Sequence, residues 1–551
     1  MRRTIRTTAA LVAAVVIWWV VAVPPAPEHA EGAPNPELRR RTLAGAIHVH
    51  SAESDGTAPR SAIAAAAARA GLQFVVFTDH GDATRAPVPP TYASGVLCLD
   101  AVEISTNAGH YLAIGLPQAP YRLGGEAAAV AEDVRRLGGF GIIAHPDSTR
   151  QELAWSDWHV AADGVEWLNA DSAWRSRSWP SLIRSAFGYW VRPGATLAAM
   201  LDRPVATLRR WDAITAQRPM PAFAGLDAHG GVGRSSFDGG RSGIAGIPSY
   251  DASFESFSVR AVLRNAPTGN AVTDGAALLE ALRAGRTYTV IDGQATAGWI
   301  EVTAARPGGV ASMGESLPGN GAASMFVRLP SLADTTVIVL RNGAPMLQTA
   351  GAKDQLTISE PGAYRVEVRR RNAPDAAPWI LTNPIYMDLP SPPAEAAPTF
   401  TPQQSLLDAD WRTEHDPAST AELAHTESAI ELTYRLDPGQ RSPFAALVVP
   451  LDHATPFSGV SVTLSSNPPT RVSLQFRSAD GRERWRRSII GSAPAHPVTL
   501  AVSDFVPISP TGRALEPSVA ASLLIVVDLV NSVPGARGRI VLHQLSLGRV
   551  E

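Results

Sequence analysis

Short apolar runs that end in histidine or a carboxylate recur through the first half of the chain. Six of the seven histidines between residues 40 and 230 belong to such motifs. The motifs cover residues 45–50, 74–80, 102–105, 110–114, 142–146 and 224–229. Imidazoles and carboxylates are the ligands that hold Zn, Mn or Fe, and α/β barrels assemble their active sites where strand ends converge on one face. The pattern therefore predicts a multinuclear metallohydrolase.

The stretches between these motifs predict helices that alternate with strands. Residues 59–71 combine an early proline, a run of alanines and a final glycine, which favours a helix, and we expect further helices at 124–138 and 274–285. Apolar strands are expected at residues 73–80, 140–145, 164–169, 222–229 and 287–292. This alternation predicts parallel β-α units, here over residues 44–293, and hence the α/β class.

The remainder of the chain predicts β structure alone. Residues 294–389 carry short alternating strands separated by Gly/Pro turns, which is typical of a small β-sandwich. Residues 390–404 form a Pro/Ala-rich linker, and residues 405–551 favour a jelly-roll-like β-sandwich. The histidines of this last region have no recurring carboxylate partner, so we expect a separable module without catalytic residues.

The N-terminal segment predicts an extracytoplasmic protein. Arg2, Arg3 and Arg6 precede an uncharged run from Thr7 to Val23, and a basic start before an apolar run is typical of an export signal. Residues 1–23 are therefore either a cleaved signal peptide or a membrane anchor, and residues 24–43 are a linker. We expect a periplasmic, secreted or inner-membrane-anchored protein.

Composition and motif content exclude several other classes. The net charge of −3 gives no basic field, so no nucleic-acid partner is expected. Cys98 is the only cysteine, which rules out an intrachain disulfide and metal sites built from several thiolates. The sequence has neither a Walker loop nor a nucleophile-elbow serine that would compete with metal chemistry.

The histidine and carboxylate motifs follow one another in a definite order along residues 43–293. His48-x-His50 comes first, then a Ser54-Asp55-Gly56 loop, Thr78-Asp79-His80, Glu103, His110, His145 and Asp227-x-His229. This order resembles that of the PHP (polymerase and histidinol phosphatase) superfamily, and the resemblance implies an irregular (β/α)7-type barrel. It also implies that His48, His50, Asp55, His80, Glu103, His110, His145, Asp227 and His229 hold two or three divalent ions, either Mn, Zn or Fe.

Within this set the roles of single residues stay open. Asp79 is expected either to take part in catalysis together with His229 or, as its place beside His80 favours, to orient a ligand imidazole through a hydrogen bond. Glu103 is either a ligand or the partner of an arginine. His110 depends on whether the preceding loop brings it back to the cluster.

Polar residues at and beyond the strand ends are the candidates for substrate binding. Glu166 and Asn169 end the strand at 164–169, where they either contact substrate or satisfy the loop backbone. Arg175 and Arg234 lie just beyond strand ends, where a guanidinium suits a phosphate ester, and the plainer alternative is a solvated loop arginine. The seven tryptophans between His145 and Asp227 line a cleft, form a lid, rest on a membrane or pack in the core.

The expected function is an exported metal-dependent phosphoesterase that hydrolyses a small-molecule ester with metal-activated water. The end of the barrel region also resembles the exported PHP branch that includes carbaryl hydrolase-like proteins, so hydrolysis of a carboxyl ester or carbamate is the alternative. A third hypothesis is a non-catalytic protein that binds the cell envelope or a glycan. In either enzymatic case the C-terminal sandwich is expected to dock onto a polysaccharide or envelope partner.

Overall fold

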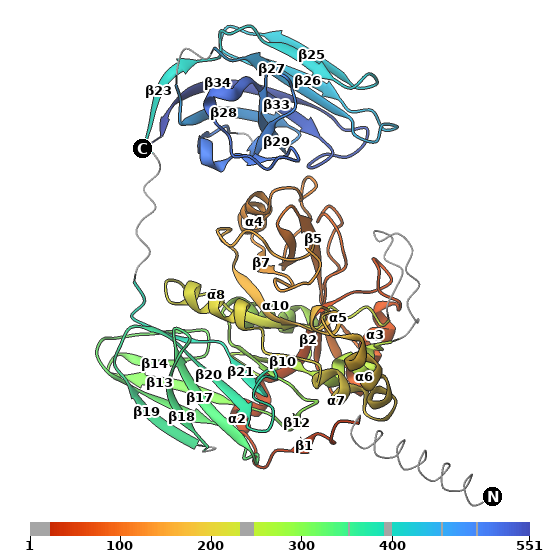
Figure 1. Ribbon diagram of the computed structural model, residues 1–551, viewed down its shortest axis with the longest axis vertical. Helices are drawn as coiled ribbons and strands as arrows, with labels where there is room; N and C mark the ends of the chain where they lie inside the picture. The colour runs from red at the N-terminus through yellow and green to blue at the C-terminus, as the bar shows by residue number, and fades with distance from the viewer. Residues whose placement is uncertain are drawn as a thin grey trace, which may run out of the picture. The chain divides into compact units, whose positions relative to one another are not determined.

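The computed structural model describes residues 23–231, 247–350, 353–390, 399–452, 456–491 and 494–550 (Figure 1). Contacts divide the chain into two compact units. The first unit holds residues up to 81, 87–117 and 134–392, and the second holds residues 82–86, 118–133 and 393–551. Among the described residues, no helix is long and apolar enough to cross a membrane. The predicted export segment and Arg234 lie outside the described residues.

Seven strands of the first unit pair edge to edge and carry the candidate site at their ends. They are β2 (Thr42–Val49), β3 (Phe74–Phe77), β5 (Val96–Thr106), β6 (Gly109–Ile114), β7 (Phe140–Ile143), β8 (Gly164–Asn169) and β9 (Ala222–Gly225). β6 runs antiparallel to both β5 and β7, and the other neighbouring pairs are parallel. The N–H of Leu226 donates to Ile47 O and that of His50 to Ala228 O, both at 3.0 Å, so the segment after β9 returns to β2.

Helices lie between β2 and β3, between β6 and β7 and between β8 and β9, and two more follow β9, so the predicted alternation holds for part of the sheet. The helices are α3 (Arg60–Arg69), α4 (Ala127–Arg136), α5 (Ala170–Arg175), α6 (Trp179–Val191), α7 (Pro193–Ala198), α8 (Val205–Thr215), α9 (Tyr250–Ser256) and α10 (Ala271–Arg283). α10 begins three residues earlier than expected because Asn270 caps it, accepting from the N–H groups of Val272 and Thr273. The mixed α/β class is confirmed. The apolar core joins strand residues such as Ile47 and Ile142 to Leu278 of α10.

The sheet continues from β2 into the region predicted as a small sandwich. The first half of β2 pairs with β10 (Ser258–Val262), which pairs with β11 (Thr287–Val290). β11 in turn pairs with β21 (Ile380–Thr382), so backbone hydrogen bonds cross the expected boundary at residue 293. Beyond it lie β17 (Thr335–Arg341), β20 (Gly362–Arg370), β22 (Ile385–Met387) and a sheet of β14 (Gly309–Ser312), β13 (Glu301–Arg306), β16 (Ala323–Arg328) and β19 (Lys353–Ile358).

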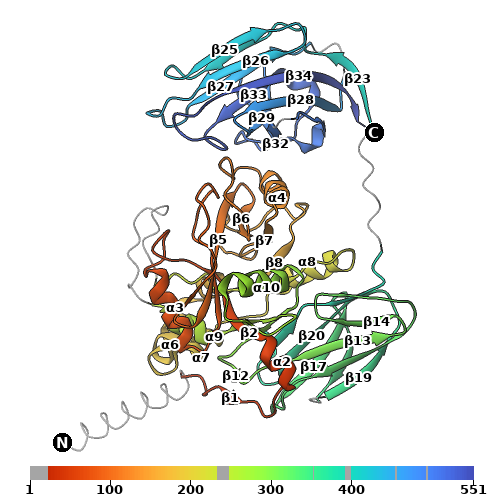
Figure 2. The ribbon, with the colours of Figure 1, turned by 180° about the vertical axis from the view of Figure 1, so that it is seen from behind.

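The second unit is built mainly from two antiparallel sheets (Figure 2). One contains β23 (Phe400–Ser405), β25 (Thr420–His425), β26 (Ile430–Arg435), β28 (Gly459–Asn467), β31 (Pro497–Ala501) and β34 (Arg537–Val550). The other contains β24 (Arg412–His415), β27 (Phe444–Pro450), β29 (Thr470–Ser478), β30 (Arg484–Gly491), β32 (Val506–Pro507) and β33 (Ala520–Asp528). Inward residues of both sheets, among them Leu432 and Ile525, form one buried core.

The second unit also includes a piece of chain from the α/β region, which the sequence did not predict. Glu126 accepts hydrogen bonds from the N–H of Ser488 at 2.7 Å and from its hydroxyl at 3.0 Å. Arg471 of β29 pairs with Asp133 in α4 at 2.6 Å. The C-terminal strands therefore share their compact unit with residues 118–133, instead of forming a module limited to residues 405–551.

Candidate metal centre

The side chains of the cluster project from the ends of the seven strands and from the loops that follow them. Three of these residues adopt a positive φ: His48 at 65°, His145 at 29° and Asp227 at 51°. Residues other than glycine rarely occupy this region, and such strain concentrates at functional sites. His48 lies within β2, whereas His145 and Asp227 each lie two residues beyond the end of β7 and β9.

All nine side chains that the resemblance implied as ligands come together. They form four overlapping groups whose ligand atoms lie within 4.8 Å of one another: His50, Asp55, His80 and His229; His48, Glu103 and His145; His48, His50 and Asp227; and His80, Glu103 and His110. Several residues belong to more than one group, as bridging ligands do in multinuclear sites. His110, the least certain position in the sequence, is brought to the cluster by the β5–β6 pairing.

Glu103 occupies the middle of the cluster and is fully buried. Its Oε1 lies 2.8 Å from His110 Nδ1 and 2.9 Å from His145 Nε2. Its Oε2 lies 3.2 Å from His48 Nε2, 3.1 Å from His50 Nε2 and 3.3 Å from His80 Nδ1. No arginine contact explains this carboxylate among the described residues, so its surroundings match those of a bridging ligand.

Asp55 and Asp227 supply two further carboxylates. Asp55 Oδ2 is 3.2 Å from His229 Nε2, and Asp227 Oδ1 is 3.3 Å from His50 Nε2. The rings of His50 and His229 stack in parallel with their centroids 4.3 Å apart. The cluster therefore alternates imidazoles and carboxylates, and each carboxylate faces at least two imidazoles.

The unsatisfied atoms of the cluster fit divalent ions. His48 Nε2 and His50 Nε2 are buried and have no hydrogen-bond partner, whereas buried polar atoms in proteins are normally bonded. Both atoms face carboxylate oxygens at distances that allow a shared cation. A donor set of imidazole nitrogens and carboxylate oxygens, without thiolate, suits Zn, Mn or Fe.

Hydrogen bonds to the far side of several rings fix which nitrogen faces the cluster. His145 Nδ1 lies 3.0 Å from Leu153 O, and His229 Nδ1 lies 2.8 Å from Asp227 O. Since a carbonyl oxygen can only accept, Nδ1 carries the proton and Nε2 is left with its lone pair toward the cluster. This arrangement is typical of histidines that bind metal.

Opposite charges inside the cluster shift the pKa values of its buried imidazoles and carboxylates. Burial alone would lower the pKa of His48, but Glu166, Asp227 and Glu103 raise it well above its usual value. Burial would likewise raise the pKa of Glu103, but the surrounding imidazoles hold it well below its usual value. Without metal, His48 and the carboxylates around it therefore stabilise one another's charged forms, a role that bound cations can take over.

Glu166 lies directly behind the cluster and orients it. Its Oε1 is 2.6 Å from His48 Nδ1, and its Oε2 accepts the N–H of His145 at 2.6 Å and the amide of Asn169 at 2.9 Å. A Cβ at Gly225 would lie 1.7 Å from Glu166 Oε1, so only glycine leaves room for this carboxylate. The sequence singled out Glu166 as a substrate-binding candidate, and its contacts favour a positioning role.

Asp79 is also occupied by structural contacts. It accepts hydrogen bonds from the N–H of Ser51 at 2.7 Å, from the hydroxyls of Ser51 and Ser54 at 2.8 Å, and from Arg60 at 2.9 Å. These bonds fix the loop that carries Asp55. Of the two predicted roles for Asp79, the geometry favours orientation over direct catalysis.

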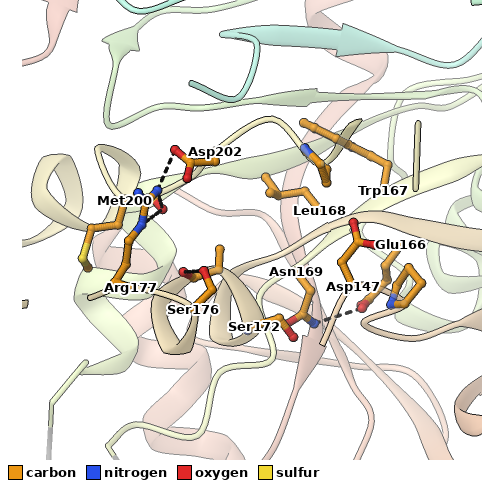
Figure 3. Close-up of a pocket in the computed structure, with 13 residues that line it drawn as sticks. Asp147, Glu166, Trp167, Leu168, Asn169, Ser172, Ser176, Arg177, Met200 and Asp202 are labelled. Carbon is orange, nitrogen blue, oxygen red and sulfur yellow. Dashed lines mark hydrogen bonds and ion pairs between the residues drawn. The ribbon is translucent and has the colours of Figure 1, made fainter. Parts of the chain in front are cut away.

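A cavity of about 170 Å³ adjoins the cluster through Glu166 (Figure 3). Its wall includes Pro146, Asp147, Trp167, Leu168, Asn169, Ser172, Ala173, Ser176, Arg177, Met200, Asp202 and Pro204. Asn169, predicted to bind substrate, lines it, whereas Arg175 pairs with Asp171 and is not part of the lining. Arg177 lines it instead, bound to Asp202 at 2.7 Å. The sequence suggested Arg175 as a substrate-binding residue, but nothing in it distinguished Arg175 from Arg177.

Comparisons with known proteins were made for the whole chain. No protein-family model and no curated protein matches it. Among solved structures, it is similar to a two-domain protein containing a predicted PHP-like metal-dependent phosphoesterase from Bacteroides vulgatus, at 15% identity and a TM-score of 0.30, covering 66% of this chain and 100% of that chain. It is also similar to a family 11 carbohydrate-binding module of a cellulosomal cellulase of Clostridium thermocellum, at 14% identity and a TM-score of 0.22, covering 27% of this chain and 96% of that chain. The chemistry open to this chain is therefore inferred from its own side chains.

Proposed function

We propose that this protein is a metal-dependent hydrolase that cleaves a phosphate ester. The observation that carries the proposal is the nine-residue cluster of imidazoles and carboxylates, with His48 Nε2 and His50 Nε2 buried and unbonded at its centre. A purely structural role for this cluster is disfavoured, because isolating so many ionisable groups from water is costly unless they bind cations or one another. Membership of the PHP superfamily, implied by the order of the motifs, is part of the proposal.

The four overlapping groups would hold two or three divalent ions, with Glu103 as the carboxylate shared between two groups. Ions bound there would lower the pKa of coordinated water and draw charge from the oxygens of the reacting ester. Glu166 keeps the Nδ1 proton of His48 engaged, so that Nε2 stays a ligand. His80 and His229 are partly exposed and are the imidazoles placed to pass a proton at the rim.

The adjoining cavity supports a small polar substrate. Arg177 supplies a guanidinium, and Asn169, Ser172 and Ser176 supply further polar groups along the same wall. A guanidinium can bind two phosphoryl oxygens at once, which suits a phosphate monoester or diester. Arg177 is paired with Asp202, an exposed carboxylate, and an anionic substrate would compete with that carboxylate for the same donors.

A substrate panel tests the proposal. The purified protein, loaded with Mn or Zn, is offered an aryl phosphate, an aryl phosphodiester, a carboxyl ester and a carbamate. We expect phosphate ester hydrolysis that is lost in His48→Ala and Asp227→Ala and retained in His159→Ala, which removes an exposed histidine outside the cluster. Hydrolysis of only the carboxyl ester or carbamate would replace the substrate class, and no hydrolysis by fully loaded protein would contradict the proposal.

A further inference from the structure

Helix α6 turns its large apolar side chains outward. Trp179 and Trp190 are each 79% exposed, and Ile183, Phe187 and Val191 are 55%, 44% and 43% exposed. At 100° per residue these five positions fall within an arc of about 120° on one side of the helix. A helix on the surface of a globular protein normally directs such a stripe toward the core. In α6 the arrangement is reversed.

The opposite side of α6 explains why the helix keeps this orientation. Gly188 is buried, and the hydroxyl of Tyr189 accepts the N–H of Ser249 at 2.8 Å. Ser249 caps α9, and α6 packs with α7 in the same part of the first unit (Figure 2). Gly188 and Tyr189 therefore hold this side of α6 against the protein. The tryptophans of α6 remain exposed on the other side.

The first described residues lie at the C-terminal end of α6, and they indicate what the exposed face of this helix contacts. Arg192, the residue that follows α6, donates from Nη1 to Pro24 O at 2.6 Å. The residues just before Pro24 are the uncharged run from Thr7 to Val23, which has 17 residues and follows three arginines. An apolar run of about 20 residues suffices to cross a bilayer, and this one comes close. A bilayer that held this run would also lie next to α6.

The composition of α6 matches the surface of such a bilayer. The helix contains no acidic residue, Arg184 lies at the border of the apolar arc, and Arg192 follows its last turn. Tryptophan prefers the headgroup level of a membrane, and basic residues beside an apolar face are attracted to anionic lipids. We propose that α6 lies on an anionic lipid bilayer with its apolar side chains inserted at the boundary between headgroups and acyl chains. This proposal is independent of the hydrolase function.

Site-specific fluorescence quenching tests the proposal on the full-length chain. Cys98→Ala removes the native thiol, and Ile183→Cys or Phe187→Cys places one bimane fluorophore on α6. The protein is reconstituted in phosphatidylcholine–phosphatidylglycerol vesicles with brominated acyl chains, and iodide serves as the aqueous quencher. Val272→Cys is the matched control, since Val272 is a 62% exposed apolar residue on another helix of the same unit.

We expect bromolipid to quench the fluorophores at positions 183 and 187 at least threefold more strongly than the one at position 272, and iodide to show the opposite order. Iodide quenching equal to the control would place this face in water and overturn the proposal. Protection from both quenchers would also overturn it, because a second copy of the chain or residues 1–22 would then cover α6. Equal bromolipid quenching in pure phosphatidylcholine would overturn the preference for anionic lipid.

Adding Trp190→Glu to the Ile183→Cys chain checks that the stripe itself is responsible. The substitution places a charge on a highly exposed residue, so the melting temperature should stay unchanged. Bromolipid quenching at position 183 should fall at least twofold. Undiminished quenching in a folded variant would show that α6 is held near lipid by other parts of the chain, and would contradict insertion of its apolar face.

Discussion

Arg471 and Asp133 form a buried ion pair although 338 positions separate them in the sequence. Arg471 Nε lies 2.6 Å from Asp133 Oδ2, and both side chains are only 1% exposed. Tyr121 donates its hydroxyl to the same carboxylate at 2.8 Å. The contact joins a strand of the C-terminal sheets to the second half of α4. Each partner depends on the other because neither has access to water.

Removing one partner should therefore cost more than removing both. Arg471→Leu leaves a buried carboxylate without its counterion, and we expect a loss of about 3–5 kcal/mol in the free energy of unfolding. Arg471→Leu combined with Asp133→Leu should recover part of that loss. Thermal or denaturant unfolding measures both variants, and Arg482→Ala, at an arginine that is 86% exposed, is the control. A single variant as stable as the control would show that the pair contributes little.

Metal content is the most direct prediction from the cluster. The protein loaded with Mn or Zn and freed of excess metal should retain two or three ions per chain, because nine possible ligand residues gather in four overlapping groups. His48→Ala and Asp227→Ala should each lower the number by at least one ion, while His159→Ala leaves it unchanged. Elemental analysis gives the count. Less than one ion in the loaded parent protein would mean that the cluster is not a metal centre.

Glu166→Gln should weaken the centre without removing any ligand. The substitution takes away the charged acceptor behind His48, and loss of such a partner typically reduces metal affinity about 10- to 100-fold. Gly225→Ala should act in the same direction, since its methyl group would displace Glu166. Competition with a chelator measures the affinity, and Glu152→Gln, at an exposed glutamate, is the control. Unchanged affinity in both variants would rule out the positioning role.

Glu367 in β20 should make the stability of the first unit depend on acid pH. Burial opposes its charge, but Arg365, Arg203 and Arg369 lower its pKa from 4.5 to about 2. A carboxyl whose pKa is depressed by folding stabilises the protein above its unfolded pKa and loses this effect as the pH falls toward the folded value.

Glu367→Gln should therefore be less stable than the parent at pH 7, by about 3 kcal/mol at most. The difference in melting temperature should shrink steadily below pH 4.5. Melting curves recorded from pH 7 down to pH 3 test this, again with Glu152→Gln as the reference for a surface carboxylate. A difference that stays constant across this range would show that the ionisation of Glu367 contributes no stability.

The sequence predicted most strands of the α/β region because each buried strand is a short apolar run. Residues 164–169 form β8 with the expected bounds. The resemblance of the motif order to a known superfamily implied which histidines and carboxylates gather, and the structure brings these nine side chains together. The helices α5 to α8 were not predicted, since α5 and α7 are only six residues long and Pro180, Pro193 and Pro204 interrupt this segment of the sequence.

Contacts between segments that are distant in the sequence could not be predicted from local sequence patterns. Glu166 looked like a substrate-binding residue because it lies near the end of a strand, and only the structure shows its hydrogen bonds to His48 and His145. Likewise, no periodicity in residues 118–133 indicates that Asp133 meets an arginine of β29. Such pairs form only through tertiary packing, and the residues next to each partner in the sequence do not reveal them.

The ion pair between α4 and β29 also sets an order of events during synthesis. Arg471 leaves the ribosome 338 residues after Asp133, which at usual elongation rates is a delay of roughly 17–70 s. Throughout that interval Asp133 and Glu126 must stay hydrated, because their partners Arg471 and Ser488 have not yet been made. The first turns of α4 can thus reach their final environment only after nearly the entire polypeptide has been made, so a prematurely terminated chain would keep two carboxylates and an uncovered helix exposed to proteases.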